Sequence, residues 1–210
     1  MSEDRISYIK KIIDNLKVVS YDEHDVMCSS SFIKIKSGDY KLNNNEVINR
    51  ERVTKCSGNM NAVVIFAITK EKRILMVVQP RVFLSTETRV TIEMPAGYVD
   101  ANESVLDAAK RELAEETGYV SNNLNIIDSY YPSLGYSGEK ISIVLALECE
   151  KKYNQDLDDD EFLSYFDVTG SELLFLMDNS YILDATTKLT YYEVVDYLKK
   201  NNRFLEVFNA

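Results

Sequence analysis

The stretch of sequence that decides the fold is GYVDANESVLDAAKRELAEETGY, residues 97–119. Its second half, SVLDAAKRELAEET, has helical periodicity, and Gly118 directly after it is a typical helix end. Successive residues of an α-helix step by about 100°, so the carboxylates of Glu112, Glu115 and Glu116 share one face. The segment therefore predicts a helix that follows a glycine turn and presents a cluster of negative charge.

This carboxylate cluster indicates a metal site. Like charges repel one another, and the negative end of the helix dipole lies close by, so the cluster has no stabilising role of its own. A divalent cation removes the conflict and attracts phosphate oxygens to the same point. Gly97 permits a close backbone turn, where the Ala96 carbonyl offers another oxygen ligand. Arg111, four residues before Glu115, can hold that carboxylate by an ion pair. A solvated acidic face is the alternative for the cluster alone, and the fixed spacing of Glu103 and the glycines argues against it.

The composition favours a hard cation at this site. The 210-residue chain contains one histidine, His24, which we expect in an exposed loop, so a histidine-based zinc site is excluded. Three widely spaced cysteines are expected to be reduced and mostly buried: Cys28, Cys56 and Cys149. The ligands must therefore be mainly carboxylates, which favours Mg²⁺, with Mn²⁺ as the alternative.

Charge and hydropathy exclude other classes of function. The formal net charge is -10 and the chain has no Lys/Arg cluster, so we expect no nucleic-acid partner. No apolar run reaches membrane-spanning length, and we expect no membrane partner. The charged, amphipathic N-terminal sequence does not resemble a signal peptide, which predicts a cytoplasmic location.

Periodicity predicts an α/β (α+β) chain. A helix is expected over residues 3–17, and strands within residues 26–53, with a turn at Ser37, Gly38 and Asp39. NAVVIFAIT and RILMVVQ, separated by TKEK, predict a neighbouring pair of buried strands. Further strands are expected within residues 90–100, 124–132, 140–150 and 160–168, and further helices over residues 170–179 and 190–201.

Residues 97–119 resemble the Nudix box, usually written GX5EX7REUXEEXGU, where U is a bulky aliphatic residue. Every charged and glycine position matches, and the departure is Tyr119 at the last position, where the residue has a packing role. The resemblance implies the family fold, an α/β/α sandwich with a mixed sheet, and hydrolysis of a nucleoside diphosphate linked to another group. We therefore expect a Nudix hydrolase domain over residues 58–205, preceded by a small N-terminal helix and β-rich extension over residues 1–57.

The flanking segments resemble the ADP-ribose pyrophosphatase subfamily. Gln79, Pro80 and Arg81 stand where the subfamily has QYR, with Pro80 in place of the aromatic residue. The run EMPAG before the box and the segment at residues 184–187 also match. The subfamily's SPG-x-S-x-E loop has its counterpart in SLGYSGE, with Leu134 at the proline position. The resemblance implies ADP-ribose or a related nucleoside-diphosphate sugar as substrate.

The candidate site residues fall into three groups: metal ligands, catalytic residues and substrate-binding residues. The expected metal ligands are Ala96, Glu112, Glu115 and Glu116. The expected catalytic residues are Glu139 as general base, with Glu115 as the alternative, and Arg111, which orients the carboxylates. Arg81 is expected to bind the diphosphate through two hydrogen bonds. A surface ion pair for Arg81 and a surface carboxylate for Glu139 are the alternatives. The remaining expected substrate-binding residues are Arg52, in the base pocket, Glu93, Gly135 and Ser137.

The sequence is also compatible with two other functions, and it suggests an oligomeric state. The chain could hydrolyse another nucleoside diphosphate derivative or a nucleoside triphosphate, or it could be a non-catalytic, nucleotide-binding regulatory domain. The intact carboxylates of residues 97–119 favour the enzyme. The family resemblance also implies a homodimer joined through the N-terminal strands, because residues 26–53 lack an obvious core of their own.

Overall fold

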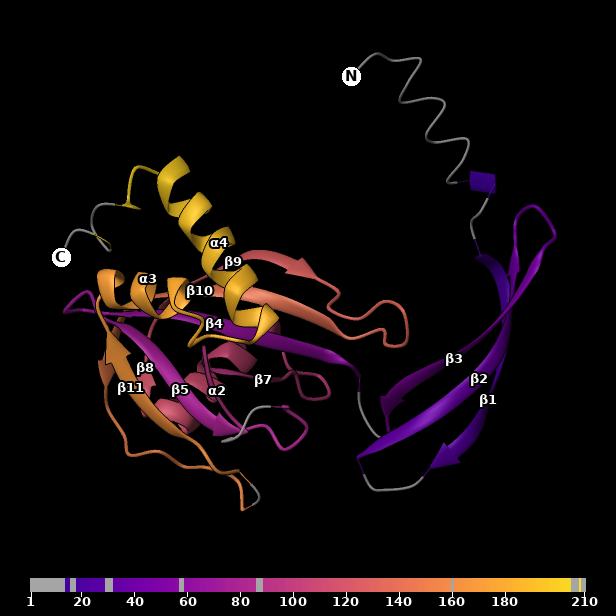
Figure 1. The fold of residues 1–210 in the computed structure, drawn as a ribbon, viewed down its shortest axis with the longest axis horizontal. Coiled ribbons are helices and arrows are strands. Elements are labelled where there is room, and N and C mark those ends of the chain that lie inside the picture. The colour runs from indigo at the N-terminus through magenta and orange to yellow at the C-terminus, as the bar shows by residue number, and fades with distance from the viewer. Residues whose placement is uncertain are drawn as a thin grey trace, which may run out of the picture. The chain divides into compact units, whose positions relative to one another are not determined.

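A computed structural model describes residues 14–15, 18–28, 32–56, 59–85, 89–159, 161–204 and 208. The chain divides into two compact units (Figure 1). The first comprises the described part of Met1–Asn59 together with Ser133–Gly138, and the second comprises the described parts of Met60–Pro132 and Glu139–Ala210. Of the helix expected over residues 3–17, Asp14 and Asn15 are described and helical, and the remainder lies outside the described residues.

The first unit contains a three-stranded antiparallel sheet in the order β1–β2–β3. Its strands are β1 (Val18–Cys28), β2 (Ile33–Leu42) and β3 (Val47–Lys55). The expected strand character is correct, although the sheet begins at Val18, earlier than the sequence pattern indicated. His24 is exposed, as expected, but lies within β1 and not in a loop.

The turn expected at Ser37, Gly38 and Asp39 is wrong, because these residues pair with both neighbouring strands in the middle of β2. Gly38 serves close packing: an added Cβ would lie 2.6 Å from the Asp22 carbonyl oxygen. The chain reverses after Leu42 instead. There Asn45 adopts a left-handed φ of 69° and its N–H donates to the Leu42 carbonyl at 3.0 Å. A glycine that marks a turn in sequence can equally mark a close approach of two backbones.

The second unit is built on a mixed sheet in the strand order β11–β5–β4–β10–β8. Strand β4 runs parallel to β10, and all other strand pairs of this sheet are antiparallel. Off this path, β6 pairs with β5, β7 with β4 and β9 with β10. The strands are β4 (Asn61–Thr69), β5 (Ile74–Pro80), β6 (Val90–Glu93), β7 (Ala96–Tyr98), β8 (Tyr119–Val120), β9 (Asn123–Tyr130), β10 (Lys140–Lys151) and β11 (Ser164–Val168).

Helices cover both faces of this sheet, as Figure 1 shows. Helix α2 (Val105–Thr117) packs on one face, where alternate β4 side chains, including Val63 and Ile65, join its buried residues Ala109 and Leu113. Helices α3 (Gly170–Asp178) and α4 (Ala185–Lys200) pack on the other face against Val64, Phe66 and Ile68. Burial on both faces explains the continuous apolar run of β4. The expected α/β/α sandwich with a mixed sheet is confirmed.

The start of helix α4 differs from the sequence prediction. Helix α4 begins at Ala185, five residues before the expected start, because the Asp184 side chain accepts a hydrogen bond from the Thr187 N–H at 2.6 Å and caps it. Cys149 is buried, which raises the pKa of its thiol to about 12, and Cys56 is partly buried. The side chain of Cys28 lies outside the described residues.

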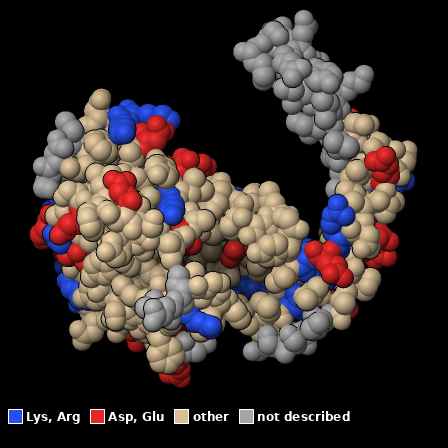
Figure 2. All heavy atoms as spheres, in the orientation of Figure 1, with Lys and Arg blue, Asp and Glu red and all other residues tan. Residues whose placement is uncertain are grey.

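Charged side chains of both signs are interspersed over the face seen in Figure 2. Several are paired on the surface, for example Lys200 with Asp196 at 2.5 Å and Lys152 with Glu150 at 2.6 Å. In the part of the chain that the structure describes, no helix is both long enough and apolar enough to cross a membrane.

Candidate active site

Helix α2 carries the predicted carboxylates, and its own sequence fixes both ends. The Ser104 hydroxyl accepts a hydrogen bond from the Asp107 N–H at 3.1 Å and caps the first turn. Gly118 ends the helix with φ 70°, and its N–H donates to the Ala114 carbonyl at 2.7 Å. This left-handed conformation favours glycine. The predicted helix and its glycine stop are confirmed.

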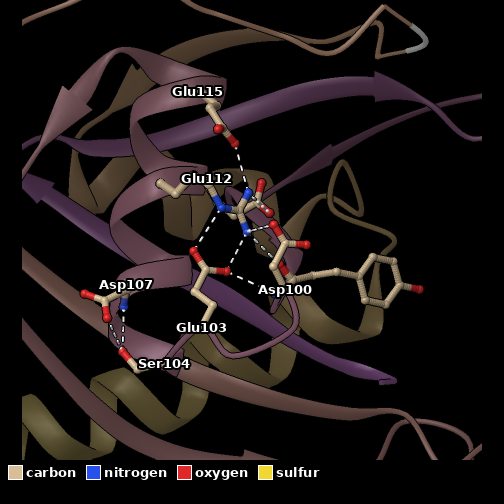
Figure 3. A network of polar contacts seen from close by, with 8 residues as sticks. Asp100, Glu103, Ser104, Asp107, Glu112 and Glu115 are labelled. Atoms are coloured by element: carbon tan, nitrogen blue, oxygen red, sulfur yellow. Dashed lines mark hydrogen bonds and ion pairs between the residues drawn. The ribbon is translucent and has the colours of Figure 1, made fainter. Parts of the chain in front are cut away.

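Arg111 forms ion pairs with a group of carboxylates, which Figure 3 labels as Asp100, Glu103, Glu112 and Glu115. Its guanidinium forms a two-bond fork with Glu103, at 3.0 and 2.9 Å. Nη1 of the same group donates to Glu112 at 2.8 Å and to Glu115 at 3.0 Å, so the expected Arg111–Glu115 pair is present. One cation therefore sets the positions of three carboxylates, which is the arrangement that the orienting role of Arg111 requires.

Two of the helix carboxylates are buried. Glu112 is 8% exposed and Glu116 is 3% exposed. Burial raises the pKa of Glu112 to about 7 despite the nearby Arg111, and it raises the pKa of Glu116 to about 9. Each shift means that the environment supplies too little positive charge for the ionised form. A bound cation would supply that charge.

Strand β7 approaches these carboxylates closely. An added Cβ at Gly97 would lie 2.0 to 2.3 Å from the carboxylate atoms of Glu112, so a glycine is needed for space. Next to it, the Ala96 N–H donates to Glu116 at 3.0 Å. The structure thus brings the Ala96 backbone to Glu116 and Gly97 to Glu112, and Arg111 links Glu112 to Glu115.

The residues present fit a hard divalent cation, because the donors are carboxylate oxygens in a partly buried cradle. Within the described residues, no three acidic, cysteine or histidine side chains stand in a ready metal-binding arrangement. Arg111 Nη1 donates hydrogen bonds to both Glu112 and Glu115.

Tyr98 connects this network to Glu139. The Tyr98 carbonyl accepts a hydrogen bond from Arg111 at 2.9 Å, and its hydroxyl donates to Glu139 at 3.2 Å. Burial, together with the Glu139 carboxylate, raises the pKa of Tyr98 to about 12, so the phenol stays protonated and remains a donor. Sequence reasoning missed Tyr98, since it occupies an unconstrained position of the motif; its place next to Gly97 was the available signal.

Arg81 and Glu93 form a second charged pair. Arg81 Nε and Nη2 donate to the two oxygens of Glu93 at 2.8 and 2.6 Å. Gln79 donates to the same carboxylate at 3.1 Å, and so does the Thr91 hydroxyl. The Glu93 side chain is 6% exposed and that of Arg81 is 54% exposed. Arg81 is thus held on one side and open to an anionic ligand on the other.

The remaining candidates belong to the first unit. Arg52 donates to Glu23 at 2.8 and 2.9 Å, so its guanidinium is held within the N-terminal sheet. The loop Ser133–Gly138 joins β3: the Val53 N–H donates to the Tyr136 carbonyl at 2.8 Å, and Ser137 bridges to Val53. Among the described residues other than its own chain neighbours, none places a heavy atom within 4 Å of a Cβ built at Gly135.

The segment at residues 184–187 holds, by a hydrogen bond, the backbone that leads into β7 and the site. The buried Thr187 hydroxyl accepts a hydrogen bond from the Met94 N–H at 3.1 Å. Met94 precedes the turn that leads into Gly97. Helix α4, on the far face of the sheet from α2, therefore holds the strand that approaches the carboxylates.

Comparison with known proteins gives this arrangement a family. A model of the NUDIX domain matches residues 58–181, which is more than half of the chain. The chain belongs to the Nudix family. The resemblance of residues 97–119 to the Nudix box is confirmed, and the box forms the turn after β7 and the whole of α2.

Several known proteins are similar to this chain over most of their length. An ADP-ribose pyrophosphatase of Bacillus subtilis (strain 168) is 35% identical over 160 residues, covering 76% of this chain and 83% of that protein. A methanol dehydrogenase activator of Bacillus methanolicus is 33% identical over 174 residues, covering 81% and 90%. The crystal structure of an ADP compounds hydrolase superposes with a TM-score of 0.71 at 21% identity, covering 90% of this chain and 97% of that one. This structural match confirms the fold.

Proposed function

We propose that this Nudix protein hydrolyses the pyrophosphate bond of ADP-ribose, or of a closely related nucleoside-diphosphate sugar, to a nucleoside monophosphate and a sugar phosphate. The observation that carries the proposal is a set of α2-associated carboxylates: Arg111 holds Glu103, Glu112 and Glu115, and the Ala96 N–H holds Glu116. Support for the substrate comes from the relatives named as ADP-ribose pyrophosphatases in Bacillus subtilis and Saccharomyces cerevisiae.

The metal ligands in this proposal are Glu112, Glu115 and Glu116, with the Ala96 carbonyl in support, and the cation is Mg²⁺ or Mn²⁺. A bound divalent cation supplies acidity to a coordinated water and neutralises charge on the phosphates. The chain's own contribution is placement: Arg111 fixes Glu112 and Glu115, and the Ala96 N–H fixes Glu116.

The reaction is the attack of one water molecule on a phosphorus atom of the diphosphate. A new P–O bond forms, the bond to the bridging oxygen breaks, and that oxygen leaves with the other phosphate. Glu139 accepts the proton of the attacking water, with Glu115 as the alternative base. Tyr98 supports Glu139 in this role, because its hydroxyl donates to that carboxylate and orients it.

Arg81 is the proposed contact to the diphosphate. Its fork with Glu93 fixes the guanidinium plane, and its exposed edge carries the remaining N–H donors. A planar guanidinium recognises phosphate oxygens through paired hydrogen bonds. Arg52, Glu93, Gly135 and Ser137 remain the other proposed substrate-binding residues.

A substrate panel tests the proposal. Purified protein with Mg²⁺ is incubated with ADP-ribose, other ADP-, GDP- and UDP-sugars, nucleoside triphosphates and dinucleoside polyphosphates, and the products are separated by ion-exchange chromatography. We expect AMP and ribose 5-phosphate from ADP-ribose, and no products when a chelator replaces Mg²⁺. Turnover of triphosphates without turnover of any nucleotide sugar would replace the preferred substrate class.

A regulatory role is the second candidate, and the relative named methanol dehydrogenase activator favours it. A purely regulatory Nudix domain would bind nucleotide without turnover. The same panel separates the two functions: binding of ADP-ribose by calorimetry with no products after prolonged incubation would establish the regulatory one.

We also propose that the protein is a homodimer joined through the N-terminal extension, residues 1–57. The sheet β1–β3 exposes large apolar side chains, among them Tyr21 at 68% and Val47 at 60% exposure. Exposed apolar groups gathered on a small sheet are typical of a surface that another chain covers.

A further inference from the structure

The C-terminal end of α2 is held by a segment that is distant in sequence, residues 151–156, which we call the α2 clamp. The last carbonyls of an α-helix have no partner within the helix. Here four consecutive ones accept hydrogen bonds from the clamp. The donors are Asp156 N to Glu115 O at 2.9 Å, Gln155 Nε2 to Glu116 O at 2.6 Å, Lys151 Nζ to Thr117 O at 2.6 Å, and the N–H groups of Lys152 and Tyr153 to Gly118 O, both at 3.0 Å.

Two of these contacts are made by side chains, and one of the side chains is itself held in place. Lys151 Nζ donates to the Tyr165 hydroxyl at 2.6 Å and lies 4.3 Å from the centre of the Tyr165 ring. The same ammonium lies 5.4 Å from the Tyr119 ring, and the two rings meet edge to face at 6.0 Å. Aromatic faces attract cations at these distances. The aromatic cage keeps the ammonium at the end of the helix.

Tyr119 is the position at which the box departs from its aliphatic pattern. An aliphatic residue could fill the same space against the sheet, but it has no negative ring face to present to Lys151. The departure therefore belongs with the clamp: Tyr119 and Lys151 are paired neighbours on β8 and β10.

The clamp acts where negative charge accumulates. The C-terminal end of a helix carries a partial negative charge, and Glu112, Glu115 and Glu116 lie within the last two turns of α2. The Lys151 ammonium places a positive charge directly on that end. Gln155 and Asp156 hold the peptide groups of Glu116 and Glu115, so the backbone positions of both residues are fixed from outside the helix.

We propose that Lys151 and Gln155 are positioning residues for the metal-binding carboxylates of α2. Without them the last turn of the helix loses two of its external hydrogen bonds and a compensating charge. Glu115 and Glu116 then no longer share a fixed arrangement, and the affinity for the divalent cation falls. This inference rests on the proposed metal-dependent hydrolysis.

The test is Mn²⁺ binding, measured by electron paramagnetic resonance in the absence of substrate, on the full-length protein. We expect Lys151→Met to weaken Mn²⁺ binding roughly two- to tenfold, the range of effects seen for charges at helix ends. Gln155→Leu removes an uncharged donor and should also weaken binding roughly two- to tenfold, the factor that corresponds to the loss of one hydrogen bond. Lys151→Arg keeps the charge, a donor for Thr117 and the contact with the aromatic rings, and should restore binding to within about twofold. Lys70→Met is the matched control, since it removes an exposed lysine that pairs with Glu150.

Activity and stability measurements separate positioning from plain structural support. In the variants kcat should fall, and the Mn²⁺ concentration for half-maximal rate should rise, by the same factor as the binding constant. A clamp that only stabilises the fold would lower the Tm and leave Mn²⁺ binding unchanged, and that outcome overturns the inference. If Lys151→Met does not fold, Gln155→Leu decides alone. Wild-type protein that binds no Mn²⁺ would overturn the proposed function itself, and this inference with it.

Discussion

Glu116 combines burial with a place in the carboxylate cluster, and this makes it the most informative single residue. Burial raises its pKa to about 9, so the carboxyl is neutral near pH 7 unless positive charge is added. A glutamine resembles the neutral form in size and shape, and its amide oxygen can still accept the hydrogen bond from the Ala96 N–H. A substitution here therefore separates charge from structure.

We predict that Glu116→Gln lowers kcat more than about a hundredfold, because a metal ligand is lost, and even the loss of a group that only hydrogen-bonds to a metal ligand costs about 10- to 100-fold. The free energy of unfolding in the absence of metal should stay within about 1 kcal/mol of wild type. Steady-state hydrolysis of ADP-ribose and chemical denaturation measure the two quantities. A variant with wild-type kcat would refute the metal assignment.

Arg81 gives a second prediction at this scale. Lysine cannot form the two-bond fork with Glu93 or a paired contact to a diphosphate, so Arg81→Lys should raise KM about tenfold and change kcat little. Arg73→Lys is the control, because Arg73 is also ion-paired, through Nε to the Asp167 carboxylate at 2.8 Å and through Nη2 to the Asp167 backbone carbonyl at 3.0 Å. If KM is unchanged and only the Tm falls, Arg81 is a structural ion pair with Glu93.

The site residues that could be predicted from the sequence lie close together in the chain, whereas those that could not be predicted come from distant segments. Glu112, Glu115 and Arg111 lie on one helix, so periodicity alone places them together, and the structure does so. Tyr98 and Lys151 reach the network through contacts between segments distant in the chain, 41 positions apart for Tyr98 and Glu139. No local pattern encodes such contacts.

At the scale of secondary-structure elements, the close packing of β7 on α2 determines where the site residues lie. Gly97 has no left-handed conformation, so its need for glycine is purely one of space. We predict that Gly97→Ala displaces the Glu112 side chain and lowers kcat about a hundredfold, the cost of misplacing a reacting group by about 1 Å. The Tm should change little, because the displaced group is the end of a flexible side chain. Differential scanning calorimetry and ADP-ribose turnover check both parts, and a large loss of Tm with kcat retained would contradict the steric argument.

The N-terminal sheet contains its own pH-dependent element. The side chain of Glu23 is 8% exposed, and its hydrogen bonds with Arg52 lower the pKa of the carboxyl to about 2. Because this folded pKa lies below the ordinary value of 4.5, the pair stabilises the sheet above about pH 4.5, and the contribution is lost as the pH falls towards 2.

We therefore predict that Arg52→Met destabilises the protein by about 1–3 kcal/mol at pH 7, and that the difference from wild type shrinks between pH 4.5 and pH 2. Thermal unfolding of wild type and Arg52→Met, from pH 7 down to pH 2, measures this difference in stability. Arg50→Met, an exposed neighbour on β3 that bonds the adjacent Asn49 carbonyl, should show no such pH-dependent difference. A difference in stability between Arg52→Met and wild type that stays constant with pH would mean that Arg52 acts through packing alone.

Element types were easier to predict from the sequence than element boundaries. The apolar run of β4 and the periodicity of α2 are strong signals because whole faces of these elements are buried. The β2 turn was misplaced because Gly38 serves close strand packing, and α4 starts early because Asp184 supplies a cap that periodicity does not reveal.

At the scale of the whole molecule, the proposed homodimer makes a prediction about mass. Wild-type protein should sediment at twice the 24.1 kDa chain mass at micromolar concentration, and Tyr21→Glu should shift the equilibrium towards the monomer, because it places a charge on the exposed N-terminal sheet. Phe175→Glu is the control, since Phe175 on α3 is similarly exposed at 58%. A wild-type monomer, or equal weakening by both substitutions, would contradict a dimer joined through residues 1–57.

The parallel pairing of β4 with β10 determines when, during synthesis and folding, the catalytic centre can form. Parallel neighbours need a long crossover connection, and here that connection contains β7 and the whole of α2. During synthesis the carboxylate helix is therefore made well before Glu139 and the strand β10 that follows it and ends at Lys151. The nascent chain cannot complete its catalytic centre until β10 has docked beside β4, so activity should appear only after this long-range strand pairing has formed.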